Sequence, residues 1–186
     1  MRTLLIQRSI TVSASAERAR TSRLGTGAWH FLAALTVVQG AHMVEHVVQL
    51  AQVTVLGVAD DDALGLLGYV VQFNGTEEWL HLGYNATFAL GLYALILPLW
   101  RAIPAGLPAW AFWVFAAGCV WLETWHMVEH GVIIAGVLEH GGCPCPGIGD
   151  AALGVTDTVL HFGYNAIATA CLAIVFIHAR RRRRGQ

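Results

Sequence analysis

Apolar residues dominate four long stretches of the chain, and short segments rich in polar residues, glycine and proline separate them. The stretches cover residues 28–58, 77–100, 109–138 and 155–177. Each is longer than the roughly 20 residues that an α-helix needs to cross a bilayer. The pattern therefore predicts an all-α integral membrane protein, a bundle of four transmembrane helices.

The segments between these stretches predict how the helices are connected. Residues 57–76 and 139–154 form two loops on one side of the membrane, and residues 101–108 form a short turn with two prolines on the other. An Arg/Ser/Thr/Ala-rich arm, residues 1–26, precedes the first helix, and an arginine tail, residues 180–186, follows the last. Four crossings place both termini on the same side.

Polar motifs inside the apolar stretches occur twice. The sequence His-Met-Val-Glu-His stands at residues 42–46 and, unaltered, at 126–130. A second motif, Leu-His-Leu-Gly-Tyr-Asn-Ala at residues 80–86, recurs at 160–166 with six of seven residues identical. The motif offsets are 84 and 80 residues. The chain is therefore predicted to be a tandem duplication of a two-helix unit, with repeats at residues 27–101 and 102–179.

Charge is scarce and sorted along the chain. Charged residues make up 12% of the sequence, against about 25% in soluble domains. All 11 basic residues are arginines, and they lie in the first arm, at Arg101 and in the tail, whereas the acids gather mainly in the other loops. Because positive residues mark the cytoplasmic side, we expect a multi-pass cell-membrane protein with both termini cytoplasmic. The lipid bilayer is the expected partner, and no nucleic acid is.

Histidines and carboxylates of each half are predicted to meet at one depth. With a rise of about 1.5 Å per residue, His42 lies about 20 Å and His46 about 25 Å from Trp29 along the first helix. Glu77 and His81 fall in the first turns of the next helix, counted inward from the outer loop. Both counts lead to the outer leaflet, and the second half repeats them.

Helical spacing also places these side chains on shared faces. His42 and His46 are four residues apart, as are Glu77 and His81, so each pair lies on one side of its helix. Imidazole and carboxylate groups from two helices suffice to bind one transition-metal ion, either iron, copper or zinc. We expect one or two ions, with ligands drawn from these residues: His42, Glu45, His46, Glu77, His81, His126, Glu129, His130, Asp157 and His161.

Other uses of the histidines stay open at this stage. Haem b would require axial imidazoles from two helices, which His42 with His126 or His81 with His161 could supply. A purely structural network of interhelical hydrogen bonds is a further alternative. The His-x-x-x-His spacing resembles one histidine box of membrane desaturases and hydroxylases, but the other boxes are missing, so it assigns no family.

Two functions are compatible with such a site. One is a small oxidative metalloenzyme acting on a lipid-soluble or small substrate. The other is a metal-handling or electron-relay protein without its own substrate, which could work with other membrane subunits. Cys143 and Cys145 lie in the second outer loop and form either a simple turn or an entry point for metal.

Overall fold

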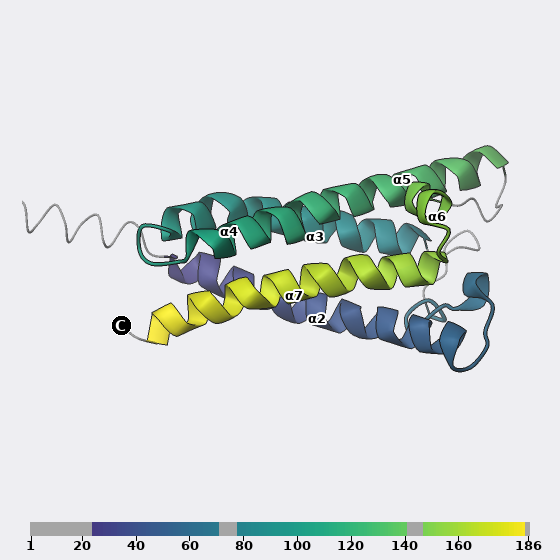
Figure 1. The fold of residues 1–186 in the computed structure, drawn as a ribbon, viewed down its shortest axis with the longest axis horizontal. Helices are drawn as coiled ribbons and strands as arrows, with labels where there is room; N and C mark the ends of the chain where they lie inside the picture. The colour runs from purple at the N-terminus through teal and green to yellow at the C-terminus, as the bar shows by residue number, and fades with distance from the viewer. Residues whose placement is uncertain (1–23, 71–77, 141–146, 185–186) are drawn as a thin grey trace, which may run out of the picture.

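The long helices of the protein lie side by side along one axis (Figure 1). A computed structural model describes residues 24–70, 78–140 and 147–184, so most of the first arm, Glu77, Cys143 and Cys145 lie outside the described residues. Every regular element within the described ranges is helical, as predicted. They are α2 (Thr26–Thr54), η1 (Asp60–Asp62), α3 (Glu78–Ala102), α4 (Ala109–Phe115), η2 (Ala116–Trp121), α5 (Leu122–His140), α6 (Ile148–Leu153) and α7 (Asp157–Arg184).

Three of these helices are long and apolar enough to cross a membrane, which indicates a multi-pass membrane protein. They are Thr26–Thr54, Trp79–Ala102 and Asp157–Arg184. The stretch predicted as the third span is helical from Ala109 to His140 and looks like one continuous rod in Figure 1, but it is built from α4, η2 and α5. This rod carries two buried glutamates, Glu123 and Glu129, which lower its apolar character.

Two structural details differ from the expectation. The last helix does not end near residue 177 but continues through the arginine run to Arg184. The second outer loop contains a short helix, α6, which ends at Gly154 with a φ of 65°. Glycine adopts this left-handed conformation without the steric penalty that a Cβ atom would bring, so α6 can turn directly into α7.

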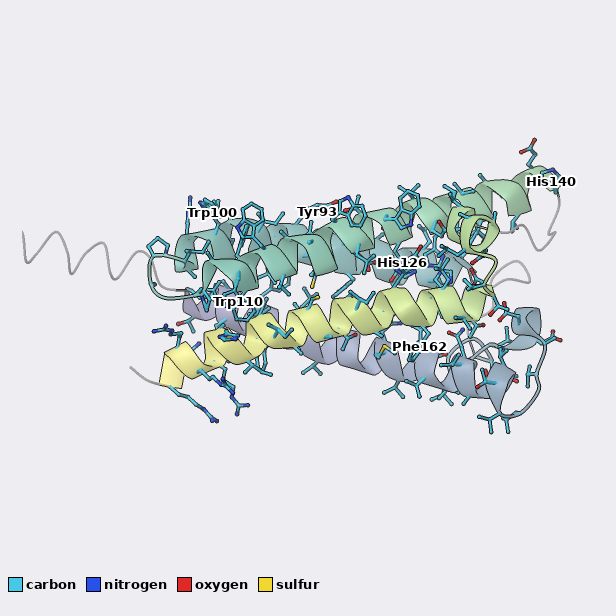
Figure 2. The ribbon with its side chains drawn as sticks, in the orientation of Figure 1. Tyr93, Trp100, Trp110, His126, His140 and Phe162 are labelled. Atoms are coloured by element: carbon cyan, nitrogen blue, oxygen red, sulfur yellow. The ribbon has the colours of Figure 1, made fainter. Side chains whose placement is uncertain are left out.

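The interior changes character along the axis. At the arginine end it is an apolar core, built from side chains of α2, α3, α4, η2 and α7 such as Leu32, Leu92, Leu99, Phe115 and Leu172. At the other end, near the outer loops, polar side chains replace the leucines (Figure 2). The apolar core therefore holds the helices together at one end and leaves the other end to the polar groups.

A π-helical segment, η2, interrupts the rod between α4 and α5. Cys119 in this segment donates its thiol to the carbonyl oxygen of Ala168 on α7, at 3.4 Å. Gly118 faces the same helix so closely that a Cβ atom there would overlap the Sγ atom of Cys171. Because π segments shift the register of the residues that follow, η2 sets which side chains of α5 face inward.

We predict that Gly118→Ala destabilises the protein by about 1–3 kcal/mol, because the added methyl group overpacks the contact with Cys171. The same substitution in a Cys171→Ala background should cost much less, since the overlapping sulfur is gone. Thermal unfolding of the four proteins of this double-mutant cycle in detergent measures the coupling. Equal losses of stability in both backgrounds would show that the effect of Gly118→Ala does not arise from the contact with Cys171.

Candidate metal centre

The structure brings six histidines from four helices into one buried cluster. None of them is more than 8% exposed. Neighbouring rings within the cluster have centroids between 4.6 and 6.4 Å apart. These are the histidines singled out in the sequence: His42 and His46 on α2, His81 on α3, His126 and His130 on α5, and His161 on α7.

The tightest group within the cluster is His126, His130 and His161. One ring nitrogen of each lies within 4.8 Å of the other two, and no other group of three potential ligands among the described residues meets this limit. The Nε2 atoms of His126 and His130 are 3.1 Å apart. Two nitrogens bound at 2.0–2.1 Å to a tetrahedral ion would be about 3.3 Å apart. The group could therefore hold a metal ion, with the His126–His130 pair already near the separation that such an ion requires.

Carboxylates lie against the outward-facing nitrogens of two of these rings. Nδ1 of His161 is 2.9 Å from Oδ1 of Asp157 and 2.9 Å from its backbone oxygen. Nδ1 of His126 is 3.6 Å from Oε2 of Glu123. At His161 the acceptors next to Nδ1 favour the tautomer that carries its proton there, which leaves the Nε2 lone pair available for a metal. At His126 the separation of 3.6 Å is too long for a hydrogen bond, and Nδ1 has no hydrogen-bond partner among the described residues.

The three histidines of the first half of the chain form a similar but looser arrangement. The Nε2 atoms of His42 and His46 are 3.0 Å apart, like the corresponding pair on α5. His81 completes the trio with ring centroids at 6.0 and 5.5 Å from these two rings. The ring of Tyr84 stacks on His42 at 3.7 Å. Glu77, the acid predicted beside His81, lies outside the described residues.

The two trios are in contact with each other. The rings of His81 and His130 have centroids 5.7 Å apart, and His46 and His161 stack at 6.4 Å. Each of these pairs joins one half of the chain to the other. The six histidines therefore form one centre rather than two isolated ones.

Glu45 and Glu129 are buried next to the histidines, but their carboxylates face the loops. Oε1 of Glu45 accepts a hydrogen bond of 2.6 Å from the backbone N–H of Leu67. Oε1 of Glu129 accepts one of the same length from Gly149. Both acids thus hold a segment that follows their helix, Leu67 in one case and the start of α6 in the other, against the helix beside the histidines. Their role as metal ligands stays a prediction.

Glycines make this close approach possible in both loops. A Cβ atom on Gly65 would overlap the carboxylate of Glu45, and one on Gly147 would overlap that of Glu129. The matching geometry shows that the shared Glu of the His-Met-Val-Glu-His motif has a structural task in each half. That task is to close the outer end over the histidines.

Glu123 is a buried residue that the sequence analysis missed. It is 2% exposed and lies three residues before His126. The position 84 residues earlier, the offset of the His-Met-Val-Glu-His motif, is Gln39, which is fully buried too. Extending the comparison of the two halves by one helical turn would have revealed this pair of polar residues inside apolar stretches.

The two members of this pair have different surroundings. Gln39 donates to Oδ1 of Asn165 at 3.0 Å and to Thr169 at 3.2 Å, and accepts a hydrogen bond of 3.1 Å from the hydroxyl of Tyr84. Oε1 of Glu123, in contrast, has no hydrogen-bond partner among the described residues. The second half therefore holds a carboxylate where the first half has a satisfied amide.

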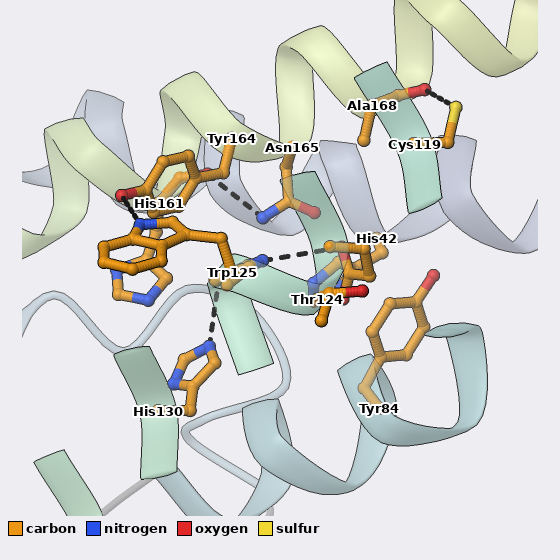
Figure 3. A network of polar contacts seen from close by, with 12 residues as sticks. His42, Tyr84, Cys119, Thr124, Trp125, His130, His161, Tyr164, Asn165 and Ala168 are labelled. Carbon is orange, nitrogen blue, oxygen red and sulfur yellow. Dashed lines mark hydrogen bonds and ion pairs between the residues drawn. The ribbon is translucent and has the colours of Figure 1, made fainter. Parts of the chain in front are cut away.

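A band of further polar contacts surrounds the centre (Figure 3). The indole of Trp125 donates to the hydroxyl of Tyr164 at 3.0 Å, and the Asn165 amide donates to the carbonyl of His161 at 3.0 Å. On the outer side, desolvation by burial and the nearby Asp157 carboxylate raise the pKa of Asp150 to about 6. The charge of Asp150 therefore changes with pH in the weakly acidic range.

We predict opposite effects from exchanging the residue types of this pair. Glu123→Gln should raise the thermal stability of the metal-free protein, because it removes a buried carboxylate with an unsatisfied oxygen. Gln39→Glu should lower it by about 1–3 kcal/mol, since a carboxylate cannot donate to Asn165 and Thr169. If Glu123 orients His126, Glu123→Gln also weakens metal binding by about 10–100-fold.

Thermal unfolding in the presence of a chelator measures the stability of the metal-free variants. Competition titrations measure their affinity for metal. A Glu123→Gln protein that loses as much stability as Gln39→Glu would show that Glu123 has a compensating partner. Unchanged metal affinity would show that it does not act on His126.

Comparison with protein-family models, with curated proteins and with solved structures finds no match for this chain.

Proposed function

We propose that this chain is an integral membrane metalloprotein whose transition-metal site lies in the outer leaflet, with His126, His130 and His161 as its primary ligands. The observation that carries this proposal is the approach of three buried imidazole nitrogens to within 4.8 Å of one another. The centre is built inside a bundle of four membrane-spanning helices, in which α4, η2 and α5 together form the third span, and in which two duplicated two-helix units each supply half of the histidines.

The energetic cost of burying these groups supports a metal over a purely structural role. An acidic side chain at the centre of a membrane helix costs about 2.5–3.5 kcal/mol on insertion scales. Hydrogen bonds between paired histidines satisfy one nitrogen of each ring, but they bring no charge to balance Glu123 and Glu129. A divalent cation among neutral imidazoles supplies that charge and at the same time binds the nitrogens.

The donor set indicates zinc, copper or iron rather than a hard ion, since imidazole nitrogen is a ligand that these three metals share.

The close packing of the histidine rings disfavours haem b. Each ring of the cluster has histidine neighbours with centroids 4.6–6.4 Å away, and a planar macrocycle between two of them would have to displace the rest.

Three histidine ligands favour a metalloenzyme over a metal carrier. Structural zinc sites have four protein ligands, whereas catalytic sites have three and keep a position open for water or substrate. With iron or copper the chemistry would be oxidative, and a site inside the bilayer would receive a lipid-soluble or small substrate. A metal-handling or electron-relay protein is the second candidate, and contact of the two trios favours it if both bind redox-active ions.

The first trio supports a second ion next to the first. The Nε2 atoms of His42 and His46 are 3.0 Å apart, against 3.1 Å for the α5 pair, and His81 occupies the same position in its sequence motif as His161. Glu77 and Asp157 are the acids at corresponding sequence positions, and Glu45 and Glu129 are the acids of the two His-Met-Val-Glu-His motifs, so all four belong to the candidate ligands.

We predict that His130→Ala and His46→Ala each lower the metal content of the purified protein, because each removes one imidazole from a three-histidine group. His140→Ala, at the exposed outer end of α5, is the matched control and should leave the metal content unchanged. Elemental analysis together with an optical spectrum measures the metal bound to each of these proteins.

Metal should also raise the melting temperature of the protein, by a margin that grows with free metal concentration.

Three results would contradict this proposal. A Soret band would mean that the cofactor is haem. Loss of metal in the His140→Ala protein to the same extent would mean that binding is not specific to the cluster. Identical melting curves from samples shown to differ in metal content would mean that the histidines serve as structural hydrogen-bonding groups.

The distribution of charge supports a topology with both termini in the cytoplasm. The described arginines, Arg101 and those of the α7 end, lie at the end of the molecule where the C-terminus is marked in Figure 1. The segments that contain Asp60 and Asp150 lie at the opposite end (Figure 1), and His126 lies nearer to this end than to the arginine end (Figure 2).

We predict that reporter fusions at the C-terminus and in the 139–154 loop report opposite sides of the membrane, with the C-terminus inside. The positive-inside rule is the reason, because the arginine-rich end stays in the cytoplasm. Reporters that give the same side for both positions would rule out the four-span arrangement, and a C-terminus found outside would reverse the orientation of the metal centre.

A further inference from the structure

A pocket of about 240 Å³ lies at the arginine end, between the ends of α2, α3 and α7. None of the six clustered histidines lines it. Its walls are mostly apolar and include Leu24, Leu99, Leu107 and Ala179. Two guanidinium groups, those of Arg182 and Arg183, complete its lining. The pocket therefore combines an apolar wall with positive charge, which neither the metal centre nor the apolar core explains.

Contacts with the rest of the protein hold both arginines at this pocket. The guanidinium of Arg183 lies over the ring of Trp29, 5.5 Å from its centroid. The guanidinium of Arg182 lies over Gly106 in the α3–α4 turn, where a Cβ atom would come within 3.1 Å of it. Gly106 has a φ of 104°, so a side chain is disfavoured there for two reasons.

Aromatic residues place the pocket at the height of the lipid headgroups. Trp29 lines the pocket, and Trp100 and Trp110 lie at the same end of the molecule (Figure 2). Both of these are about half exposed. Tryptophans concentrate where the hydrocarbon of a membrane meets its headgroups, so the two guanidinium groups lie where a lipid phosphate would be.

We propose that this pocket binds one anionic phospholipid, with its phosphate between Arg182 and Arg183 and the first part of an acyl chain against the apolar wall. A free phosphate ion would satisfy the guanidinium groups and leave the apolar wall in contact with water. The volume is below the roughly 300–1,000 Å³ of drug-sized ligand sites, so it accommodates a headgroup and the adjoining carbons, with the rest of the lipid in the bilayer.

Two other arginines at the same helix end serve as the control for a specific lipid site. Arg180 and Arg181 belong to the same helix end and carry the same charge, but they do not line the pocket. If the tail attracts anionic lipids only through its net charge, all these arginines contribute alike, at about fivefold in affinity for each residue near the surface. A specific site instead depends on Arg182 and Arg183.

Native mass spectrometry of the full-length protein, in mixed micelles of phosphatidylcholine and phosphatidylglycerol, tests this directly. We expect one retained phosphatidylglycerol per chain. The Arg182→Gln/Arg183→Gln protein should bind it about 30-fold more weakly, whereas Arg180→Gln/Arg181→Gln should retain it. Ala179→Phe, which keeps both charges and fills the pocket, should also lose it, and the metal content and melting temperature report that each variant is folded.

Equal losses in the two double variants would overturn the proposal in favour of unspecific attraction by the tail. Retention of the lipid by Ala179→Phe, or its displacement by millimolar inorganic phosphate, would show that the arginines bind the anion without the pocket. A wild-type protein that retains no phosphatidylglycerol, or retains phosphatidylcholine equally well, would overturn it as well.

Discussion

The burial of imidazoles and carboxylates inside an apolar layer is the constraint on which the rest of this structure depends. Polar groups in hydrocarbon must find partners within the protein. The fold meets this demand by gathering six histidines from four helices, none more than 8% exposed, and by keeping the apolar core at the other end. Helix packing is therefore divided between an apolar core at one end and a cluster of buried polar side chains at the other.

The two halves of the chain solve the same local problem in the same way. In each, a glutamate next to the histidines accepts a hydrogen bond from a loop amide, and a glycine allows the loop to approach. This arrangement covers the outer end of the cluster with backbone instead of a bulky side chain. The motif glutamate, which the sequence analysis predicted as a metal ligand, thus accepts a backbone hydrogen bond in both halves, and this structural task alone accounts for its presence beside both histidine pairs.

The two halves of the chain differ at the positions that precede their shared His-Met-Val-Glu-His motif. Gln39 is fully hydrogen-bonded between α2, α3 and α7, whereas Glu123 at the corresponding position faces His126. The group around His126 is also the tighter of the two trios. The π segment η2 ends two residues before this glutamate, so the irregular turn, Glu123 and two of the three histidines of the tighter group occur on one rod, and His161 joins them from α7.

The sequence by itself determined the helical class and where most of the long helices begin and end, because hydrophobic length decides these, although α7 continues seven residues beyond its predicted end at residue 177. It also indicated all six clustered histidines, since helical spacing places His42 with His46 and His126 with His130. Only the tertiary structure decided that His161 joins the α5 pair most closely, that Glu45 and Glu129 face the loops, and that Glu123 is buried beside His126. Those features depend on how helices rotate and pack against each other, which residue spacing along one helix does not specify.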